Sequence, residues 1–472
     1  METRRYYHTA LYIGMTMMAL TTLLFSACSK SDEPQPEPPQ QIEVKVLHVA
    51  GQSDNYGTLT GGGVYPQGAK VTITAEPQGN YAFYRWTKND DDEGGTLFSM
   101  AQSYTFVANE PVTLYAVFQG DGVNFPRFVG SVDELKAIND DLTKKYKLVA
   151  GLDLAGQEVM IGKDGSDFFS GEFDGNNERI QGLTINSQTG ESSIGLFRTV
   201  DKTGVVKNVW LWHPNVFGAN NVGAVVGNNK GRIEACQVSG GSIKGNNNVG
   251  GVAGYCGDDQ NNYPPITGGE IINSRSSATV DGMNHVGGIA GYFRSGLISG
   301  CQNSGAVSAS QGDSKASQVN AGGIAGMLWN MYSTIKASYN KGEVTADNYV
   351  GGIVGDMRGD VSGCYNIGKV TATEGTYVGA IAGQMYLDRH LYDSYYTYVE
   401  GLKGIGYKYG NGQHLDESRP FGDGTGGTGW PVWNERWTNT DWKDLGGWSP
   451  TNPRYPTLLW QGTASAGDEN EE

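Results

Sequence analysis

Basic residues are scarce in this chain. Its 472 residues include 34 Lys and Arg against 50 Asp and Glu, which gives a formal net charge of −16. A nucleic acid partner needs a basic face to meet its phosphates, so this balance argues against one. Only 18% of the residues are charged, which excludes a charge-driven disordered chain. The 71 glycines follow no three-residue period, which excludes collagen.

Catalytic and cofactor motifs are missing as well. The sequence contains no His-Glu-x-x-His zinc motif and no Gly-x-Ser-x-Gly nucleophile elbow. Residues 422–427 match Gly-x-Gly-x-x-Gly, but they lie in a glycine-rich loop rather than between a strand and a helix. The acidic run 89–93 lacks the EF-hand order of calcium ligands and is expected to be a solvated loop. We therefore expect no enzyme activity, no cofactor and no metal site.

The N-terminus predicts export and a lipid anchor. Arg4 and Arg5 precede an uncharged apolar run over residues 13–25, which is too short to span a bilayer and is typical of a signal peptide. The run ends in LFSAC at residues 24–28, which resembles a bacterial lipobox. The resemblance implies cleavage before Cys28, acylation of its thiol and new amine, and anchoring in the outer membrane. An ordinary secretory signal with an incidental cysteine is the alternative.

A polar, proline-rich segment follows the predicted anchor. Residues 29–41 cannot bury a core, so we expect the anchor and a flexible tether over 28–41, after a signal peptide over 1–27. The acidic start of the tether at 31–33 resembles the export signal of surface-exposed lipoproteins in Gram-negative gut anaerobes. This resemblance implies that the protein is displayed on the outside of the cell.

Short β-rich stretches and glycine turns fill residues 42–119. The stretches 71–75, 81–86, 104–107 and 112–118 alternate or are rich in β-branched and aromatic residues. Their sequences resemble the divergent internalin-B B-repeat family. The resemblance implies a small β-grasp-like domain that serves as a stalk unit in bacterial surface proteins, with Trp86 in its core.

A hexapeptide of the type Val-Gly-Gly-Ile-Ala-Gly recurs through the rest of the chain. Its first glycines lie at positions 195, 223, 250, 287, 322, 351 and 379, and a period of this size indicates a solenoid. Between the hexapeptides lie β-branched triplets and turns without a helical period. The sequence therefore predicts an all-β fold, namely a parallel β-helix of about seven coils behind the small N-terminal domain.

A second motif, such as VSGCYNIGKV at residues 361–370, follows the hexapeptides. Together the two motifs resemble the GLUG-motif family of bacterial surface proteins over residues 125–400. The family implies adhesin-like or uncharacterised surface proteins and the stalks of some large secreted peptidases. We place the β-helix with an N-terminal helical cap at 120–400.

Two columns of equivalent residues predict how the coils stack. Cys236, Cys301 and Cys364 share one repeat position, with serine there in the coils between. Like cysteines are then about 9.6 Å apart, which is too far for a disulfide, and with Cys256 elsewhere we predict four free thiols. Asparagines share a second position and predict stacked amides that bond from coil to coil: Asn303, Asn340 and Asn366.

Outward-facing aromatic residues are the candidate ligand sites. Strand alternation sends Trp210 and Trp212 outward, which favours a sugar-stacking pair unless a neighbouring loop covers it. The column after the Cys/Ser position faces outward if the cysteines face inward. It begins with Gln237, Arg275 and Gln302 and ends in a tyrosine stripe, which is a second candidate surface or a structural stack. The stripe consists of Tyr339, Tyr365 and Tyr395.

The open ends of a solenoid need covers. Residues 131–134 form a capping box that starts a predicted helix over 132–142, and this helix is expected to cover the first coil. Tryptophans crowd into residues 401–461, which favours a packed C-terminal cap, with a glycan platform as the alternative. Residues 462–472 are expected to be an acidic tail. The tryptophans are Trp430, Trp433, Trp437, Trp442, Trp448 and Trp460.

These observations together predict a surface-anchored, non-enzymatic, adhesin-like protein. Its partners are expected to be the membrane, through the lipid, and a host or environmental glycan or a matrix protein. A carbohydrate-active β-helix enzyme is one alternative, on fold analogy, and a structural cell-surface scaffold is another.

Overall fold

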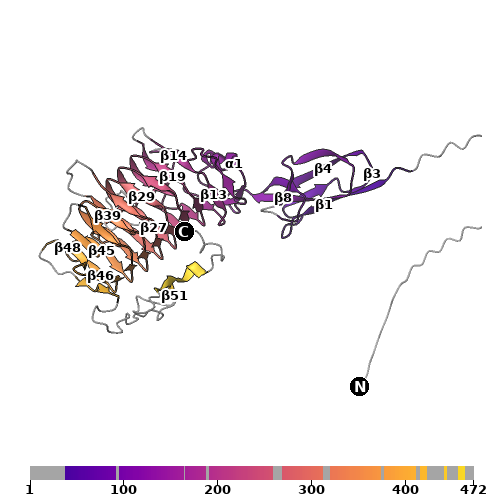
Figure 1. The fold of residues 1–472 in the computed structure, drawn as a ribbon. Helices are drawn as coiled ribbons and strands as arrows, with labels where there is room; N and C mark the ends of the chain where they lie inside the picture. The colour runs from indigo at the N-terminus through magenta and orange to yellow at the C-terminus, as the bar shows by residue number, and fades with distance from the viewer. Residues whose placement is uncertain are drawn as a thin grey trace, which may run out of the picture.

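The structure is a computed structural model that describes residues 38–91, 95–163, 165–187, 191–258, 268–311, 319–373, 377–410, 415–421, 441–443 and 455–462. Figure 1 shows a small N-terminal β domain followed by a longer rod of stacked strands. Cys28, the predicted signal peptide and most of the predicted tether lie outside the described residues, as do Trp430, Trp433, Trp437 and Trp448. No helix in the described part of the chain is long and apolar enough to cross a membrane.

The N-terminal domain contains two sheets, ordered β3-β1-β8-β5-β6 and β2-β4-β7. β1 pairs parallel with β8, and their inward residues meet those of β4 and β5. Trp86 is fully buried in this core, as predicted. The strands are β1 (Gln41–His48), β2 (Gly57–Thr60), β3 (Gly63–Pro66), β4 (Ala69–Pro77), β5 (Tyr81–Thr87), β6 (Leu97–Ser99), β7 (Ser103–Ala108) and β8 (Val112–Gly120).

A small apolar cluster joins this domain to the rod. Val117 of the domain and Val149 of the rod are both buried in it. The Tyr84 hydroxyl donates a hydrogen bond to Glu134 Oε2 at 3.4 Å, and burial raises the pKa of Tyr84 to about 12. The two bodies therefore meet through packed side chains as well as through the connecting chain.

The predicted capping box is present at the start of the rod. The Glu134 N–H donates to Ser131 Oγ at 3.2 Å, and the Ser131 hydroxyl donates to Glu134 Oε2 at 3.1 Å. Helix α1 (Val132–Ala137) is shorter than expected and passes into a 3₁₀ turn (Ile138–Asp140). Leu135 and Ile138 are fully buried in the core of the rod, so this segment covers its first coil (Figure 1).

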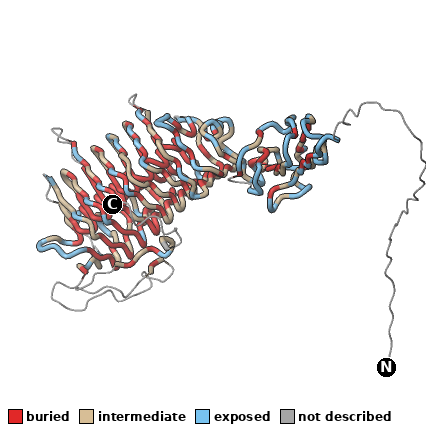
Figure 2. Tube along the Cα trace, turned by 45° about the vertical axis from the view of Figure 1, so that its right-hand side comes forward, coloured by how far each residue is buried: buried red, intermediate tan, exposed pale blue. Residues whose placement is uncertain are grey.

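The rod is a parallel β-helix, as predicted. One of its sheets has seven strands, one for each of seven successive coils. Two others have ten and eleven strands, because lead-in and closing strands extend both ends beyond the hexapeptide repeats. The hexapeptides form the fourth sheet, of fourteen strands, and Figure 2 shows buried residues along the whole length of the rod.

The eleven-stranded sheet consists of β9 (Arg127–Val129), β10 (Lys145–Leu148), β12 (Glu172–Asp174), β17 (Val205–Lys207), β22 (Arg232–Glu234), β27 (Gly269–Ile272), β32 (Gly296–Ser299), β37 (Ser333–Lys336), β42 (Asp360–Ser362), β46 (His390–Tyr392) and β49 (Leu415–Asp416). The ten-stranded sheet consists of β11 (Leu152–Asp153), β13 (Arg179–Gln181), β18 (Trp210–Trp212), β23 (Gln237–Ser239), β28 (Arg275–Ser276), β33 (Gln302–Asn303), β38 (Tyr339–Asn340), β43 (Tyr365–Asn366), β47 (Tyr395–Tyr396) and β50 (Arg419–Pro420).

The seven-stranded sheet consists of β14 (Thr184–Asn186), β19 (Asn215–Phe217), β24 (Ser242–Lys244), β29 (Thr279–Gly282), β34 (Val307–Ala309), β39 (Val344–Ala346) and β44 (Val370–Ala372). The fourteen-stranded sheet consists of β15 (Ser192–Ile194), β16 (Phe197–Val200), β20 (Asn220–Gly223), β21 (Val226–Asn229), β25 (Asn247–Gly250), β26 (Ala253–Cys256), β30 (Asn284–Gly287), β31 (Ala290–Phe293), β35 (Asn320–Gly322), β36 (Ala325–Leu328), β40 (Tyr349–Gly351), β41 (Val354–Met357), β45 (Tyr377–Met385) and β48 (Lys403–Lys408). The short pair β51 (Trp442–Lys443) and β52 (Thr457–Leu458) precedes a 3₁₀ turn (Leu459–Gly462).

The predicted amide ladder explains one glycine of the hexapeptide. Asn303 Nδ2 donates to Asn340 Oδ1, and Asn340 Nδ2 donates to Asn366 Oδ1, each at 2.8 Å. A Cβ on Gly288 would lie 2.2 Å from Asn303 Cγ, and one on Gly323 would lie 2.3 Å from Asn340 Cγ. The two repeat motifs are therefore coupled, because the ladder occupies the space that a side chain at this glycine would need.

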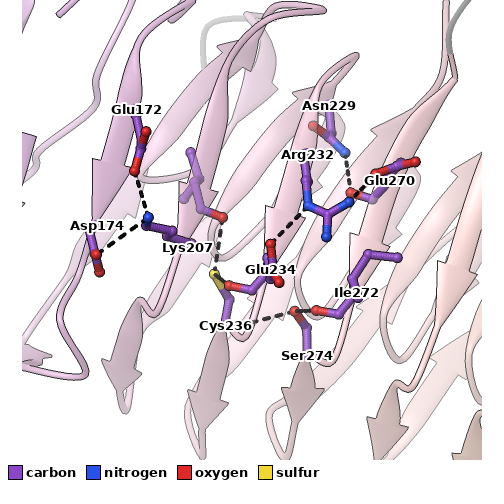
Figure 3. A network of polar contacts seen from close by, with 11 residues as sticks. Glu172, Asp174, Lys207, Asn229, Arg232, Glu234, Cys236, Glu270, Ile272 and Ser274 are labelled. Atoms are coloured by element: carbon purple, nitrogen blue, oxygen red, sulfur yellow. Dashed lines mark hydrogen bonds and ion pairs between the residues drawn. The ribbon is translucent and has the colours of Figure 1, made fainter. Parts of the chain in front are cut away.

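The described cysteines are free thiols, as predicted. All four are buried, and burial raises the pKa of Cys236, Cys301 and Cys364 to about 12. The Cys236 N–H donates to Ser274 Oγ at 3.1 Å, so serine and cysteine bond across neighbouring coils (Figure 3). The outer side of the eleven-stranded sheet carries ion pairs instead, such as Arg232 Nη1 with Glu270 Oε2 at 2.6 Å (Figure 3).

Candidate functional site

The outer face of the ten-stranded sheet brings together residues from many coils. Each strand pairs in register with the next, so equivalent side chains form a column along the rod. One column carries Trp210 and the three predicted tyrosines at different coils, and Trp212 lies in the neighbouring column with Gln181 and Ser239. The members of the first column are Arg179, Trp210, Gln237, Arg275, Gln302, Tyr339, Tyr365, Tyr395 and Arg419.

Trp210 and Trp212 lie on the outer face, as strand alternation predicts. Leu211 between them is fully buried, and both indoles are half-buried. Their ring centroids are 5.9 Å apart and the rings meet edge to face at 83°. Trp210 Nε1–H donates to Ser239 Oγ at 3.0 Å, which fixes its orientation. The two indoles therefore present a rigid aromatic corner.

A groove of about 840 Å³ runs beside these indoles. Its lining includes Arg179, Arg275 and His213, and no carboxylate belongs to the described residues that line it. The Arg179 guanidinium lies 5.6 Å from the centre of a Trp212 ring, and Arg275 Nη2 donates to Gln237 Oε1 at 2.6 Å. The groove is thus locally cationic on a chain with a net charge of −16.

The tyrosine stripe is not an exposed surface, and this candidate site was wrong. Tyr339, Tyr365 and Tyr395 are only 1%, 0% and 3% exposed. Phe421 and Trp442 pack against these rings, so no ligand can reach their faces in this arrangement. The alternative, structural stacking between coils, describes Tyr339 and Tyr365, whose ring centroids are 4.7 Å apart.

The cover is a segment that we call the strap, residues 441–443 and 455–462. The Tyr365 hydroxyl donates to the Pro456 carbonyl at 2.7 Å, and Trp460 Nε1–H donates to the Gly300 carbonyl at 2.8 Å. Trp442 is 1% exposed. These described parts of the predicted C-terminal cap lie along the side of the rod rather than across its end (Figure 1).

The lining of the groove is rich in groups that can contact a sugar. Glycoside hydrolases mostly need two carboxyl groups facing one bond, and the described lining of the groove offers none. Indoles, guanidinium groups and hydroxyls can instead stack on sugar rings and donate hydrogen bonds. Within the described residues, no group of three or more His, Cys, Asp or Glu could hold a metal ion.

Two groove residues escaped the sequence reasoning. Arg179 lies before the first hexapeptide, so alignment of the repeats does not reach it. His213 showed no motif, and it enters the groove only because it follows Trp212, with the two rings 4.9 Å apart. The repeat column did contain Arg275, but its role depends on Arg179 and the indoles in neighbouring coils.

Comparison with known proteins identifies the N-terminal domain. Residues 47–122 match the family model of the divergent InlB B-repeat domain. This match confirms the resemblance to that family in the sequence of residues 42–119. Halomucin from Haloquadratum walsbyi is 32% identical over an alignment of 166 positions, which covers 32% of this chain and 2% of halomucin. The chain therefore spans only a small part of this curated relative.

Two solved structures are similar in outline. A putative immunoglobulin A1 protease from Bacteroides ovatus superposes with a TM-score of 0.47 and 21% identity, covering 72% of this chain and 94% of that one. A second structure, described as IgA1 protease, gives a TM-score of 0.43 and 15% identity, over 76% of this chain and 29% of that one.

Proposed function

We propose that this chain is a lipid-anchored surface protein of the GLUG-motif type whose β-helix binds a glycan in the Trp210–Trp212 groove. The carrying observation is the groove itself, in which paired indoles lie beside Arg179 and Arg275. The lipobox at residues 24–28 supports anchoring through Cys28 in the outer membrane. The B-repeat domain then serves as a spacer between the membrane and the β-helix, and the similarity to part of halomucin supports a cell-surface setting.

The groove favours an anionic polysaccharide over a neutral one. Guanidinium groups bind carboxylates and sulfates through paired hydrogen bonds, and aromatic rings cover the apolar faces of sugars. Equivalent residues recur about every 4.8 Å along the rod, so an extended chain parallel to the axis meets a new side chain at each coil. Arg179 and Arg275 stand three coils apart in one column and contact different units of such a chain.

The test is a binding screen on the soluble chain from residue 29 onward. It uses matched uronate-containing, sulfated and neutral polysaccharides, together with matrix proteins, and assays each polysaccharide for cleavage. We expect saturable binding of an anionic polysaccharide without cleavage, weakened at least about tenfold in Trp212→Ala through loss of the stacking surface.

Phe217→Ala is the matched control. Phe217 belongs to the next strand of the same coil, on the seven-stranded sheet, and is 42% exposed. An equal loss in both variants would contradict a site at the groove. Cleavage products would indicate the carbohydrate-active enzyme instead, and absence of binding would favour a scaffold.

A further inference from the structure

A second hollow lies on a different sheet. On the outer face of the fourteen-stranded sheet, near its C-terminal end, a cavity of about 180 Å³ opens between aromatic side chains. We call it the tyrosine slot. Its walls are Tyr349, Tyr377, Tyr386, Tyr407 and Tyr409.

The walls are two short stacks of phenol rings. Tyr349 and Tyr377 are stacked with centroids 5.2 Å apart, and Tyr386 and Tyr409 are stacked at 4.6 Å. Tyr407 joins the first stack, with its centroid 4.6 Å from that of Tyr377. Unlike the stripe beneath the strap, these rings are half-buried or exposed, and Tyr409 is 47% exposed.

The floor of the slot is an ion pair with a carboxamide beside it. Asp356 is 2% exposed, and its Oδ2 accepts hydrogen bonds from Arg358 Nε at 3.2 Å and Nη2 at 2.9 Å. Gln384 Nε2 lies 3.5 Å from the other carboxylate oxygen. The Arg358 guanidinium is held between rings, 4.1 Å from the centre of Tyr386 and 4.9 Å from that of Trp329.

Asp356 is the acidic residue in a column whose other members, from Thr199 to Tyr407, are neutral. The register places Met327 opposite Asp356 one coil earlier and Tyr292 one coil before that. Desolvation raises the pKa of Asp356, although Arg358 opposes the shift. Replacing a buried ion pair with apolar residues is often neutral or stabilising, so packing alone gives no reason for this pair. Perturbed groups in a hollow are candidates for a functional site.

We propose that the tyrosine slot binds one neutral, hydroxyl-rich ligand unit, namely a single sugar ring. The charges of Asp356 and Arg358 cancel at the floor, so a free cation or anion gains no net attraction there. Phenol, carboxamide and guanidinium groups around a small cavity instead provide donors and acceptors for several hydroxyls. The volume of about 180 Å³ suits a single sugar ring rather than several linked rings.

This site is independent of the Trp210–Trp212 groove. The two hollows belong to different sheets and share no lining residue among those described. Failure of one proposal therefore leaves the other standing.

The experiment is a titration of the soluble chain, from residue 29 onward, with single sugars. The panel contains glucose, galactose, mannose, fucose, N-acetylglucosamine and N-acetylgalactosamine, and binding is followed by ligand-observed NMR and calorimetry. We expect at least one sugar to bind with a Kd below about 10 mM. The double variant Tyr377→Phe/Tyr409→Phe keeps both rings and removes two hydroxyls, and we expect it to weaken binding at least fivefold.

Two controls separate ligand recognition from structure. Tyr292→Phe lies on the same face outside the slot and should bind as the unchanged protein does. Trp212→Ala tests the other hollow: a sugar whose binding is lost in this variant and kept in the double variant binds in the Trp210–Trp212 groove, and that result would overturn the proposal. Phenylalanine preserves ring stacking, so a purely structural stack predicts equal melting temperatures and equal binding in the double variant. That result, or failure of every sugar to bind below about 10 mM, would overturn the proposal.

Discussion

The two halves of the ten-stranded sheet have similar outer faces and opposite accessibility. Trp210 and Tyr365 belong to one column and both point outward. Trp210 lines an open groove, whereas Tyr365 is fully buried beneath the strap. The strand geometry is the same in both halves, so the difference arises from a segment about 90 residues away along the chain, at Pro456. A repeat column thus shows where a side chain points but not what lies on top of it.

Loosening the strap should have the largest effect on the difference in accessibility between the two halves. Trp442 is 1% exposed, and its ring centroid lies 5.5 Å from that of Tyr365. Trp442→Ala should cost about 3–5 kcal/mol, as large aromatic truncations in cores do. The loss should appear as faster hydrogen exchange at residues 455–462 and as solvent exposure of Tyr339 and Tyr365.

Trp212→Ala is the control for this prediction, because its indole is only half-buried. It should cost less and leave exchange in the strap unchanged. Equal destabilisation by the two variants would mean that the covered and open halves do not differ in packing.

The fold was predictable because its evidence is local and repeated. The hexapeptide recurs in every coil, the cysteine in every second coil from Cys236 to Cys364, and the asparagine in three successive coils, and a parallel β-helix brings such equivalent positions into contact. The strap occurs once and carries no period, so its contact with Tyr339 and Tyr365 left no trace in the repeats. The groove was half predictable: alternation exposes Trp210 and Trp212, but Arg179 joins them only through the register of a lead-in strand.

A smaller effect is expected from removing one hydrogen bond between the ten-stranded sheet and the strap. Tyr365→Phe removes the donor to the Pro456 carbonyl, which is 2.7 Å from the hydroxyl oxygen, and keeps the ring. Leaving a buried carbonyl unpaired costs about 1–3 kcal/mol. Denaturant unfolding should show this loss for Tyr365→Phe and a change below about 0.5 kcal/mol for Tyr292→Phe, whose ring is only half-buried. An equal effect of both substitutions would show that the strap bond contributes nothing to the stability of the covered half.

The smallest expected difference between the two halves is in the labelling rates of their buried cysteine thiols. Cys236 lies in the coil of Gln237, in the open half, and Cys364 lies in the coil of Tyr365, in the covered half; burial raises the pKa of both to about 12. At pH 8 a thiol with such a pKa is about 10⁻⁴ ionised, so both should react with a disulfide reagent far more slowly than in denaturant. Because these pKa values are raised in the folded state, the thiols favour folding below pH 9 and lose that contribution as the pH rises from about 9 towards 12. The two labelling rates should agree within a few-fold, because the apolar core protects both thiols and the strap covers only the opposite side of the sheet. Much faster labelling at Cys236 would show instead that the strap also holds the underlying coils closed.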